Sequence, residues 1–298
     1  MINFNKFYKL FNLISVCLII SSFLLLLING LNFGVDFKGG TLIELRTNNQ
    51  QTDISILRKS FKNMNLGDVN VKKFGNENDY LIKFEKKMID ANSTENIKKD
   101  LVLSIGETFS FRRVENVGPK VSSELLRSGI IAIAISLAAM LFYIWIRFEW
   151  QFSIGSIIAI FHDVVITLGI FSFLSLEINL SIIAAVLTIV GYSMNDTVVI
   201  YDRIRENLNK YNRLNISEIA NLSINDTLAR TIITSVTTLL ALFSIFILGG
   251  EILRGFSFAM ILGVIIGTYS SIFVASPILK FFKVSYKTLE KEEEKIVP

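Results

Sequence analysis

The sequence is poor in the residues that build metal sites and disulfides, with one cysteine and one histidine among 298 residues. A single thiol, Cys17, excludes an internal disulfide and a cysteine-based zinc site. A single imidazole, His162, excludes a multi-histidine metal cluster. The net charge of +4 is no sign of nucleic-acid binding, because the basic residues flank apolar runs. We therefore expect a protein that works without metal or cofactor.

Apolar residues make up 51% of the chain, and they gather into runs long enough to cross a bilayer. The first run follows Lys6 and Lys9. It is long and lacks a small-x-small cleavage site, so we expect a retained helix rather than a signal peptide. The predicted spans are 10–31, 129–146, 152–174, 178–201, 231–248 and 256–281. The sequence thus predicts an α-helical polytopic membrane protein with six transmembrane helices.

Lysine and arginine are distributed unevenly around these spans. If the N-terminus is inside, the two short outside loops, near 175–177 and 249–255, hold only Arg254. Cytoplasmic loops carry the excess of positive charge, so we expect both termini in the cytoplasm. The predicted divisions are 1–31 with the first helix, a periplasmic domain 32–127, spans two to six over 128–281, and a cytoplasmic tail 282–298.

The block 32–127 has the pattern of a small α+β domain. Residues 41–46, 68–74, 80–84 and 109–114 alternate as strands, and Gly75-Asn76-Glu77-Asn78 is turn-like. Helices are expected after Thr52-Asp53, a predicted N-cap, and from Asn92-Ser93-Thr94-Glu95, which resembles a capping box. The order of elements is the split βαβ, or ferredoxin-like, arrangement. No catalytic residues cluster here, so we expect contact rather than enzymatic chemistry. Pro119 then precedes a helix that continues into the second span.

The fourth run contains a carboxylate, Asp196, in a stretch that otherwise reads as a membrane helix. Such a group costs about 2.5–3.5 kcal/mol even on the insertion scale that counts it least. It is expected to face a bundle interior, to have a partner or to hold a proton, which indicates ion or proton handling. The alternative is that Asp196 only caps or pairs near the cytoplasmic end of its helix.

The third run contains Asp163 near its midpoint. Ser156, Asp163 and Thr167 fall on one helical face, which predicts a polar stripe turned inward. Two interpretations stay open: a proton relay, or a buried carboxylate tied to hydroxyls that holds helices together. His162 is expected to point about 100° away from Asp163 and to serve packing.

The polar stretch 203–229 favours an amphipathic helix at the cytoplasmic interface, with a break at 221–225. Arg230 follows it and is either a flanking charge that snorkels to the interface or a partner for Asp196 at a similar depth. Gly263, Gly267 and Ser271 in the last run form a small-xxx-small face for close helix packing.

Several motifs in combination resemble the SecF proteins of the SecD/SecF family, within the RND superfamily. Gly34 to Thr41 resembles the Asp-Phe-x-Gly-Gly signature, and Phe161-His162-Asp163-Val164 resembles the His-Asp motif of the third span. Gly191 to Asn207 resembles the fourth-span signature, and Thr227 to Ser235 resembles the start of the fifth span. The motif residues are Asp36, Gly39, Gly40, His162, Gly191, Asn195, Thr197, Asp202, Arg203 and Arg205.

The resemblance implies half of an RND-type bundle in the bacterial inner membrane. It implies a protein-export subunit that works with SecD and the SecYEG channel, indirectly with SecA, and with YajC, on an unfolded polypeptide. The proton motive force would drive it, with Asp196 as the protonated carboxylate, Arg230 as its basic partner and Asp163 as an auxiliary group. Asp36, Gly39 and Gly40 would shape the junction between the first span and the outer domain.

Three rival functions are considered beside this one. The first is a proton-coupled exporter of small molecules or lipids on the same scaffold, for which a single outer domain of this size is thin. The second is an intramembrane protease built on Gly191-Tyr192-Ser193 with His162, although the histidine lies earlier in the chain than such a site expects. The third is a purely structural scaffold for the export channel.

Overall fold

The structure is a computed structural model that describes residues 1–47, 53–64, 66–67, 69–73, 78–84, 91–106, 108–211, 213–286 and 288. The chain divides into two compact units. A helical unit comprises Met1–Asn32, Ala132–Glu177 and Ser181–Pro298, and an α+β unit comprises Phe33–Ile131 and Ile178–Leu180. We describe each unit by itself.

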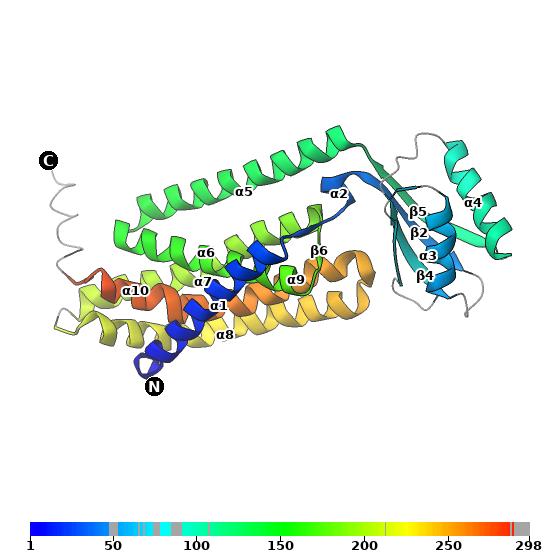
Figure 1. Ribbon diagram of the computed structural model, residues 1–298. Coiled ribbons are helices and arrows are strands. Elements are labelled where there is room, and N and C mark those ends of the chain that lie inside the picture. The colour runs from blue at the N-terminus through cyan, green and yellow to red at the C-terminus, as the bar shows by residue number, and fades with distance from the viewer. Residues whose placement is uncertain are drawn as a thin grey trace. The chain divides into compact units, whose positions relative to one another are not determined.

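Long apolar helices build the helical unit (Figure 1). The long helices are α1 (Tyr8–Ile28), α5 (Pro119–Arg147, of which the part from Ala132 onward belongs to this unit), α6 (Trp150–Phe173), α7 (Leu180–Lys210), α8 (Ile216–Leu248) and α9 (Gly250–Ser270). Three short segments complete the unit: η1 (Phe4–Lys6), the π-helical turn η2 (Ser271–Ala275) and α10 (Ser276–Phe281). Within the described ranges, six segments are long and apolar enough to cross a membrane. The six predicted spans are confirmed, and the helix predicted after Pro119 is continuous with the second span.

The predicted interfacial helix over 203–229 is wrong in its boundaries. Helix α7 continues to Lys210, and α8 begins at Ile216 and runs without a break to Leu248. The interruption lies at 211–215 instead of 221–225. Asn215 caps α8 because its side chain accepts from the Glu218 backbone and the Glu218 side chain accepts from the Asn215 backbone, a capping box.

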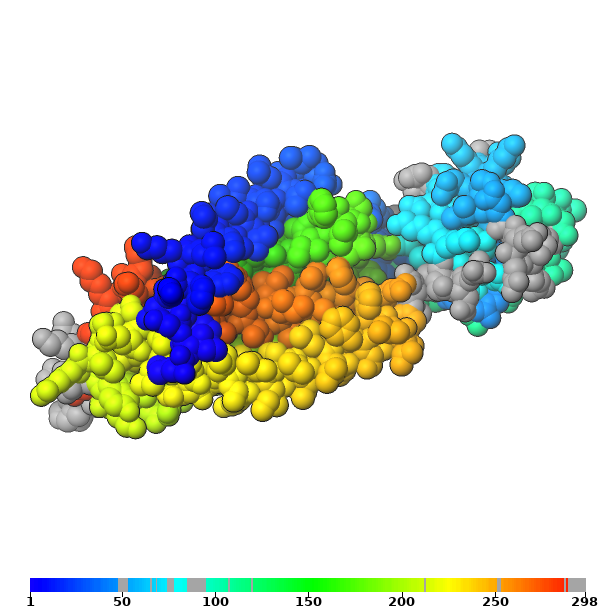
Figure 2. Space-filling model, turned by 90° about the horizontal axis from the view of Figure 1, so that it is seen from below, coloured from blue at the N-terminus to red at the C-terminus, as the bar shows by residue number. Residues whose placement is uncertain are grey.

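Asn221 and Asn225 lie inside α8 and bind the N-terminal segment. Asn221 Oδ1 accepts from the Phe4 backbone at 2.7 Å, and Asn225 accepts from and donates to the Ile2 backbone at 2.8 Å. Their role is therefore to hold the start of the chain on α8, which Figure 2 shows at one end of the unit. The polar residues of 221–225 were interpreted as a helix break, because polar residues within a continuous helix can give the same sequence pattern as a loop.

Three helices form the interior of the helical unit. Of the apolar windows, 61% of α6, 50% of α7 and 56% of the segment from α9 to α10 are buried, against 11% for α1, 11% for α5 and 17% for α8. Helix α1 lies diagonally across the outside, against α6, and α8 lies beside α9 (Figures 1 and 2). Polar groups on α6, α7 and α9 are therefore the ones enclosed by protein.

Helix α9 packs closely on α7 through its glycines. A Cβ added to Gly263 would lie 2.2 Å from Ile189 Cγ1, and one added to Gly267 would lie 3.1 Å from Ser193 Cβ. Both glycines thus permit an approach that any side chain would hinder. The predicted packing role is confirmed for Gly263 and Gly267.

The α+β unit has one four-stranded sheet with two helices packed on one face. Its elements are β2 (Gly40–Thr47), α3 (Ile54–Asn63), β3 (Val69–Lys73), β4 (Asp79–Phe84), α4 (Ala91–Ile105) and β5 (Phe109–Val117). The strands are ordered β3-β4-β2-β5, and all neighbours are antiparallel. Side chains of both helices share one core with the sheet, including Leu57, Phe61, Leu101, Ile43 and Ile82. The predicted ferredoxin-like order is confirmed.

The turn chemistry of this unit is partly described. Asp53 caps α3, since its carboxylate accepts from the Ser55 backbone at 3.0 Å. Gly39 and Gly40 have φ of 80° and 120°, conformations that favour glycine, as the tight junction predicted. The residues Thr52, Asp68 and 75–77 and the side chains of Asn92, Ser93 and Thr94 lie outside the described residues, although helix α4 already begins at Ala91.

The signature aspartate Asp36 lies in the short helix α2 (Val35–Lys38). Its Oδ2 accepts from the backbone nitrogen of Leu180, the first residue of α7, at 2.9 Å. Nearby, β1 (Asn32–Phe33) pairs with β6 (Glu177–Ile178). A carboxylate at a helix N-terminus satisfies an unpaired N–H and complements the helix dipole, so the motif stabilises the beginning of α7.

Candidate functional site

Asp163 is the centre of a buried polar cluster between α6, α7 and α9. Its side chain is 0% exposed. Oδ2 accepts from Ser193 Oγ of α7 at 2.5 Å and from Ser270 Oγ of α9 at 2.8 Å. Ser156 and Thr167 are also buried on α6, but they bond to backbone carbonyls of Phe152 and Asp163. The inward polar stripe is confirmed, and one carboxylate joins three helices.

His162 does not point away from Asp163. Its Nδ1 lies 2.8 Å from Asp163 Oδ1, and the ring is 0% exposed. The Cα–Cβ bonds of adjacent residues do diverge by about 100° on a helix. The side-chain torsions bring the two groups back together inside the bundle, so the prediction from helical geometry alone is wrong. The serine–histidine pair that the rival protease interpretation would need is not formed, since Ser193 bonds to the carboxylate of Asp163.

Asp196 is the centre of a second polar group and has weaker hydrogen bonding than Asp163. It lies on α7, one helical turn after Ser193. The residue is 3% exposed, and its Oδ2 accepts from Thr268 Oγ1 of α9 at 3.4 Å. Thr268 Oγ1 also lies 2.8 Å from Ser235 Oγ of α8. The carboxylate therefore faces the bundle interior, and a hydroxyl pair connects it with α8.

Arg230 of α8 is exposed and forms no ion pair with Asp196. It lines a cavity of 310 Å³ together with Thr227 of α8 and Phe148, which follows α5. The cavity is also lined by residues of α5 and α7: Tyr143, Arg147, Val198, Val199, Asp202, Arg203 and Glu206. Val199 is one helical turn after Asp196. The cavity thus reaches from the charged end of the bundle to the turn next to the buried carboxylate.

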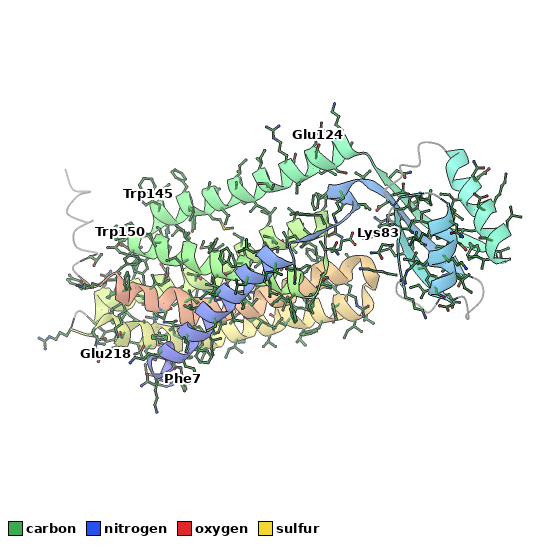
Figure 3. The ribbon with its side chains drawn as sticks, in the orientation of Figure 1. Phe7, Lys83, Glu124, Trp145, Trp150 and Glu218 are labelled. Atoms are coloured by element: carbon green, nitrogen blue, oxygen red, sulfur yellow. The ribbon has the colours of Figure 1, made fainter. Side chains whose placement is uncertain are left out.

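The remaining charged motif residues form ion pairs at the same end of the bundle. Asp202 accepts from Arg147 at 3.1 Å, and Arg205 donates to the buried Glu149 at 2.9 Å. Arg203 donates to Asp226 at 2.8 Å and to Glu206 at 2.6 Å. Trp145 and Trp150 also lie at this end (Figure 3), with exposures of 64% and 50%. Exposed tryptophans at a helix end are typical of a membrane interface.

The uncharged motif residues have different surroundings. Gly191 faces Met140, whose Cε would lie 3.6 Å from an added Cβ, so a close approach does not require glycine there. Asn195 is exposed. Thr197 is buried, and its hydroxyl has no hydrogen-bond partner among the described residues.

Two residues of the two centres, Thr268 and Ser270, were not singled out from the sequence, and Ser193 was named only for the rival protease interpretation. Ser193 lies within the fourth-span signature, and Thr268 and Ser270 flank the small-residue face of α9. They could have been predicted from their position. Each is a serine or threonine close to a small-xxx-small face and at the depth of a buried carboxylate. Small hydroxyl residues commonly pack between membrane helices without such a role.

Six membrane-length helices around two buried carboxylates define a class of protein: a polytopic membrane protein with ionisable groups in its interior. Ionisable residues in that position mark ion and proton pathways. The enclosed cluster, the looser acid and the charged cavity fit this class together.

Comparison with known proteins identifies the family. Residues 97–285 match the family model described as protein export membrane protein SecD/SecF, C-terminal, and residues 24–51 match the SecD/SecF GG motif. The protein translocase subunit SecF of Rickettsia rickettsii is 46% identical over 299 residues, with 97% of this chain and 95% of that protein covered. The SecF of Cereibacter sphaeroides is 42% identical, with 91% and 86% covered.

A solved structure agrees with these relatives. The crystal structure of SecDF from Thermus thermophilus superposes with a TM-score of 0.86 at 34% identity, and the match covers 95% of this chain. It covers 38% of the SecDF chain, so our chain spans well under half of that protein. The chain belongs to the SecD/SecF family of protein-export membrane proteins.

Proposed function

We propose that this chain couples proton movement across the inner membrane to the late steps of protein export. As a SecD/SecF family member it is a multi-pass accessory subunit of Sec-dependent export. The proposal concerns how it works: Asp196 takes up and releases the proton, and Arg230 responds to that charge. Both termini would lie in the cytoplasm and the α+β unit on the outer side, as the lysine and arginine distribution favours.

The observation that carries the proposal is the under-satisfied burial of Asp196. An ionised carboxylate in such surroundings needs several strong donors or a cation. Among the residues that the structure describes, Asp196 has one hydrogen bond, from the Thr268 hydroxyl at 3.4 Å, and no ion pair. A group held this loosely is suited to change its charge. The neighbouring cavity supplies a route for water or a proton from the charged end of the bundle to the turn that follows Asp196.

Protonation of Asp196 would change helix packing through groups that are already in contact. The groups in contact are the carboxylate and the Thr268–Ser235 hydroxyl pair between α9 and α8, which neutralisation would alter. Neutralisation would also remove the longer-range attraction between the carboxylate and Arg230, which does not contact it. Helix α5, continuous from Pro119 to Arg147, would carry a tilt to the beginning of the outer domain. The energy is adequate, because one charge crossing the membrane potential supplies about 2.3 kcal/mol per 100 mV.

The surface of α7 favours a second membrane protein as partner. Thr188, Asn195 and Asp202 are exposed at seven-residue spacing, so they lie on one face of the helix. Polar side chains turned toward lipid are costly. We propose that this face packs against SecD, and that SecYEG, SecA and YajC are reached through the assembled complex. These finer partners are inferred from the family and not from contacts in this chain.

The test is proton-dependent export in vesicles that contain this chain, its SecD partner and the channel. Asp196→Asn, which cannot ionise, is expected to abolish the proton-dependent part of export, while Asp196→Glu keeps some of it. Thr237→Val of α8 is the control, because among the described residues the Thr237 hydroxyl bonds only to the backbone carbonyls of Ile233 and Thr234. Full proton-dependent export with Asp196→Asn would contradict the proposal.

A further inference from the structure

The ring of His162 is a buried ionisable group that the proposed mechanism leaves unused. It is 0% exposed, and Nδ1 is engaged with Asp163 at 2.8 Å. Its other nitrogen, Nε2, has no hydrogen-bond partner among the residues that the structure describes. Buried polar atoms are nearly always hydrogen-bonded, so an exception calls for an explanation. An unprotonated Nε2 is an open acceptor for a proton.

The surroundings of Asp163 fit a fixed negative charge. His162 Nδ1 faces Oδ1, while Ser193 Oγ at 2.5 Å and Ser270 Oγ at 2.8 Å face Oδ2. The Ser270 hydroxyl also lies 3.1 Å from the Gly267 carbonyl oxygen. A carboxylate accepts through both oxygens and needs no proton of its own for this arrangement. With Nδ1–H donating to it, the histidine can gain a further proton only at Nε2.

The other groups around the pair fit a cation on the ring. Tyr269 of α9 stacks on His162, with 6.0 Å between ring centroids and 24° between planes, and the face of an aromatic ring attracts a cation. The Tyr269 hydroxyl bonds to Ser15 and the Phe11 carbonyl of α1, which holds its ring in place. Asp196 lies on the neighbouring helix α7, one helical turn beyond Ser193. Among the described residues no lysine or arginine contacts the pair.

We propose that His162 carries a proton on Nε2 and that Asp163 is its counter-ion. On loading, the Nε2 lone pair bonds the incoming proton, the ring becomes an imidazolium with both N–H groups, and the pair becomes neutral overall. On release, the Nε2–H bond breaks, the proton leaves and the Nδ1–H···Oδ1 hydrogen bond remains. Asp163 is thus a positioning residue, and the second proton-holding group of the bundle is the histidine.

This inference deepens the proposed function, because a second proton-holding group matters only if protons pass through the bundle. Its test measures a charge state and needs no export assay. Failure of Asp196→Asn to block export would overturn the proposed function and leave the state of His162 unaffected. A negative result at His162 would leave the role of Asp196 untouched.

His162 is the only histidine of the chain, so selective ¹⁵N-histidine labelling gives the signals of a single ring. The full chain would be purified through a tag without histidine and measured by solid-state NMR in lipid bilayers over a pH series. We expect a neutral ring protonated at Nδ1 at high pH and an imidazolium at low pH. A ring that stays neutral throughout would overturn the proposal, because Nε2 would then take up no proton. A neutral ring protonated at Nε2 with a bare Nδ1 would also overturn it, because the proton between the two groups would then reside on Asp163.

Two variants separate the counter-ion role from simple packing. Asp163→Asn, which keeps the shape of the side chain, is expected to lower the imidazolium fraction at a fixed low pH by at least tenfold. Thr167→Val is the matched control: its hydroxyl bonds to the backbone oxygen of Asp163 and not to the carboxylate. Its imidazolium fraction should equal that of the unchanged chain, and an equal fraction in Asp163→Asn would contradict the counter-ion role.

Discussion

Asp163 and Asp196 are both buried in the same bundle, and their surroundings differ in one decisive respect. Asp163 has three hydrogen-bonding groups from α6, α7 and α9 at 2.5 to 2.8 Å. Asp196 has one, at 3.4 Å. The first acid is satisfied by its contacts and holds helices together, while the second is buried without enough contacts to fix its charge. A single bundle can thus hold one carboxylate firmly while another has few hydrogen bonds, as the proposed uptake and release of a proton by Asp196 requires.

The largest expected effect is the loss of stability when the Asp163 carboxylate is removed, and it tests this comparison directly. Asp163→Ala leaves His162 and two hydroxyls without their acceptor, and breaking a buried polar pair costs about 3–5 kcal/mol. Asp196→Asn should cost less than about 1 kcal/mol, because only one weak hydrogen bond changes. Thermal unfolding of both variants in detergent checks this. Equal losses of stability would remove the distinction between the two acids.

The close packing of α9 on α7 supports both centres, and Gly263 tests it. An added methyl group would lie 2.2 Å from Ile189 Cγ1, so Gly263→Ala should cost about 1–3 kcal/mol through overpacking. Gly191→Ala is the control, because its nearest atom is 3.6 Å away. The same unfolding assay should show a drop for Gly263→Ala alone. A drop of the same size in both variants would point to a general effect of alanine.

The hydroxyls of α9 sharpen the comparison at the level of single hydrogen bonds. Ser270→Ala removes a donor from the satisfied carboxylate and should cost about 1.5 kcal/mol. Thr268→Val removes the 2.8 Å bond to Ser235 as well as the long contact to Asp196. In a Ser235→Ala background only the contact to Asp196 is left, so there we expect Thr268→Val to change stability by less than about 0.5 kcal/mol, because the bond is weak at that length. Stability measurements on the pair check the order. A larger loss for Thr268→Val in that background would show that Asp196 is held more firmly than the geometry indicates.

The last prediction concerns the α+β unit, where stability is followed against pH. Burial lowers the pKa of Lys83 from 10.5 to about 8, and the positive charges of Lys72 and Lys38 act in the same direction while Asp36 opposes them. Between these pH values the unfolded state binds more protons than the folded state, so the stability of this unit should rise with pH. The increase should disappear in Lys83→Met, as followed by chemical denaturation of the full chain. A rise of the same size in both proteins would assign it to other groups.

The sequence predicted the fold well where local patterns decide it. Apolar runs located all six spans, and alternation with turn residues located the strands from β2 to β5. It failed at the ends of α7 and α8, because Asn221 and Asn225 read as a break until the N-terminal segment supplied their partners. That contact joins residues more than two hundred positions apart, which no local pattern contains.

The candidate site shows the same limit. Asp163 and Asp196 stand out because a carboxylate is rare in an apolar run, whereas Ser193 and Ser270 look like ordinary packing residues until the helices are assembled. The direction of His162 depended on side-chain torsions that helical periodicity does not specify. The similar depth of Asp196 and Arg230 made a contact between them one of two interpretations. This structure does not show that contact, and the Thr268 hydroxyl donates to the Asp196 carboxylate instead.

The central claim is that Asp196 binds and releases the transported proton. Proton flux measures this most directly, with the chain and its partner reconstituted in vesicles that enclose a pH-sensitive dye. A pH step should give a proton flux through the unchanged complex, and Asp196→Asn should reduce it to the level of empty vesicles. An undiminished flux in Asp196→Asn, with the protein still folded, would contradict the account.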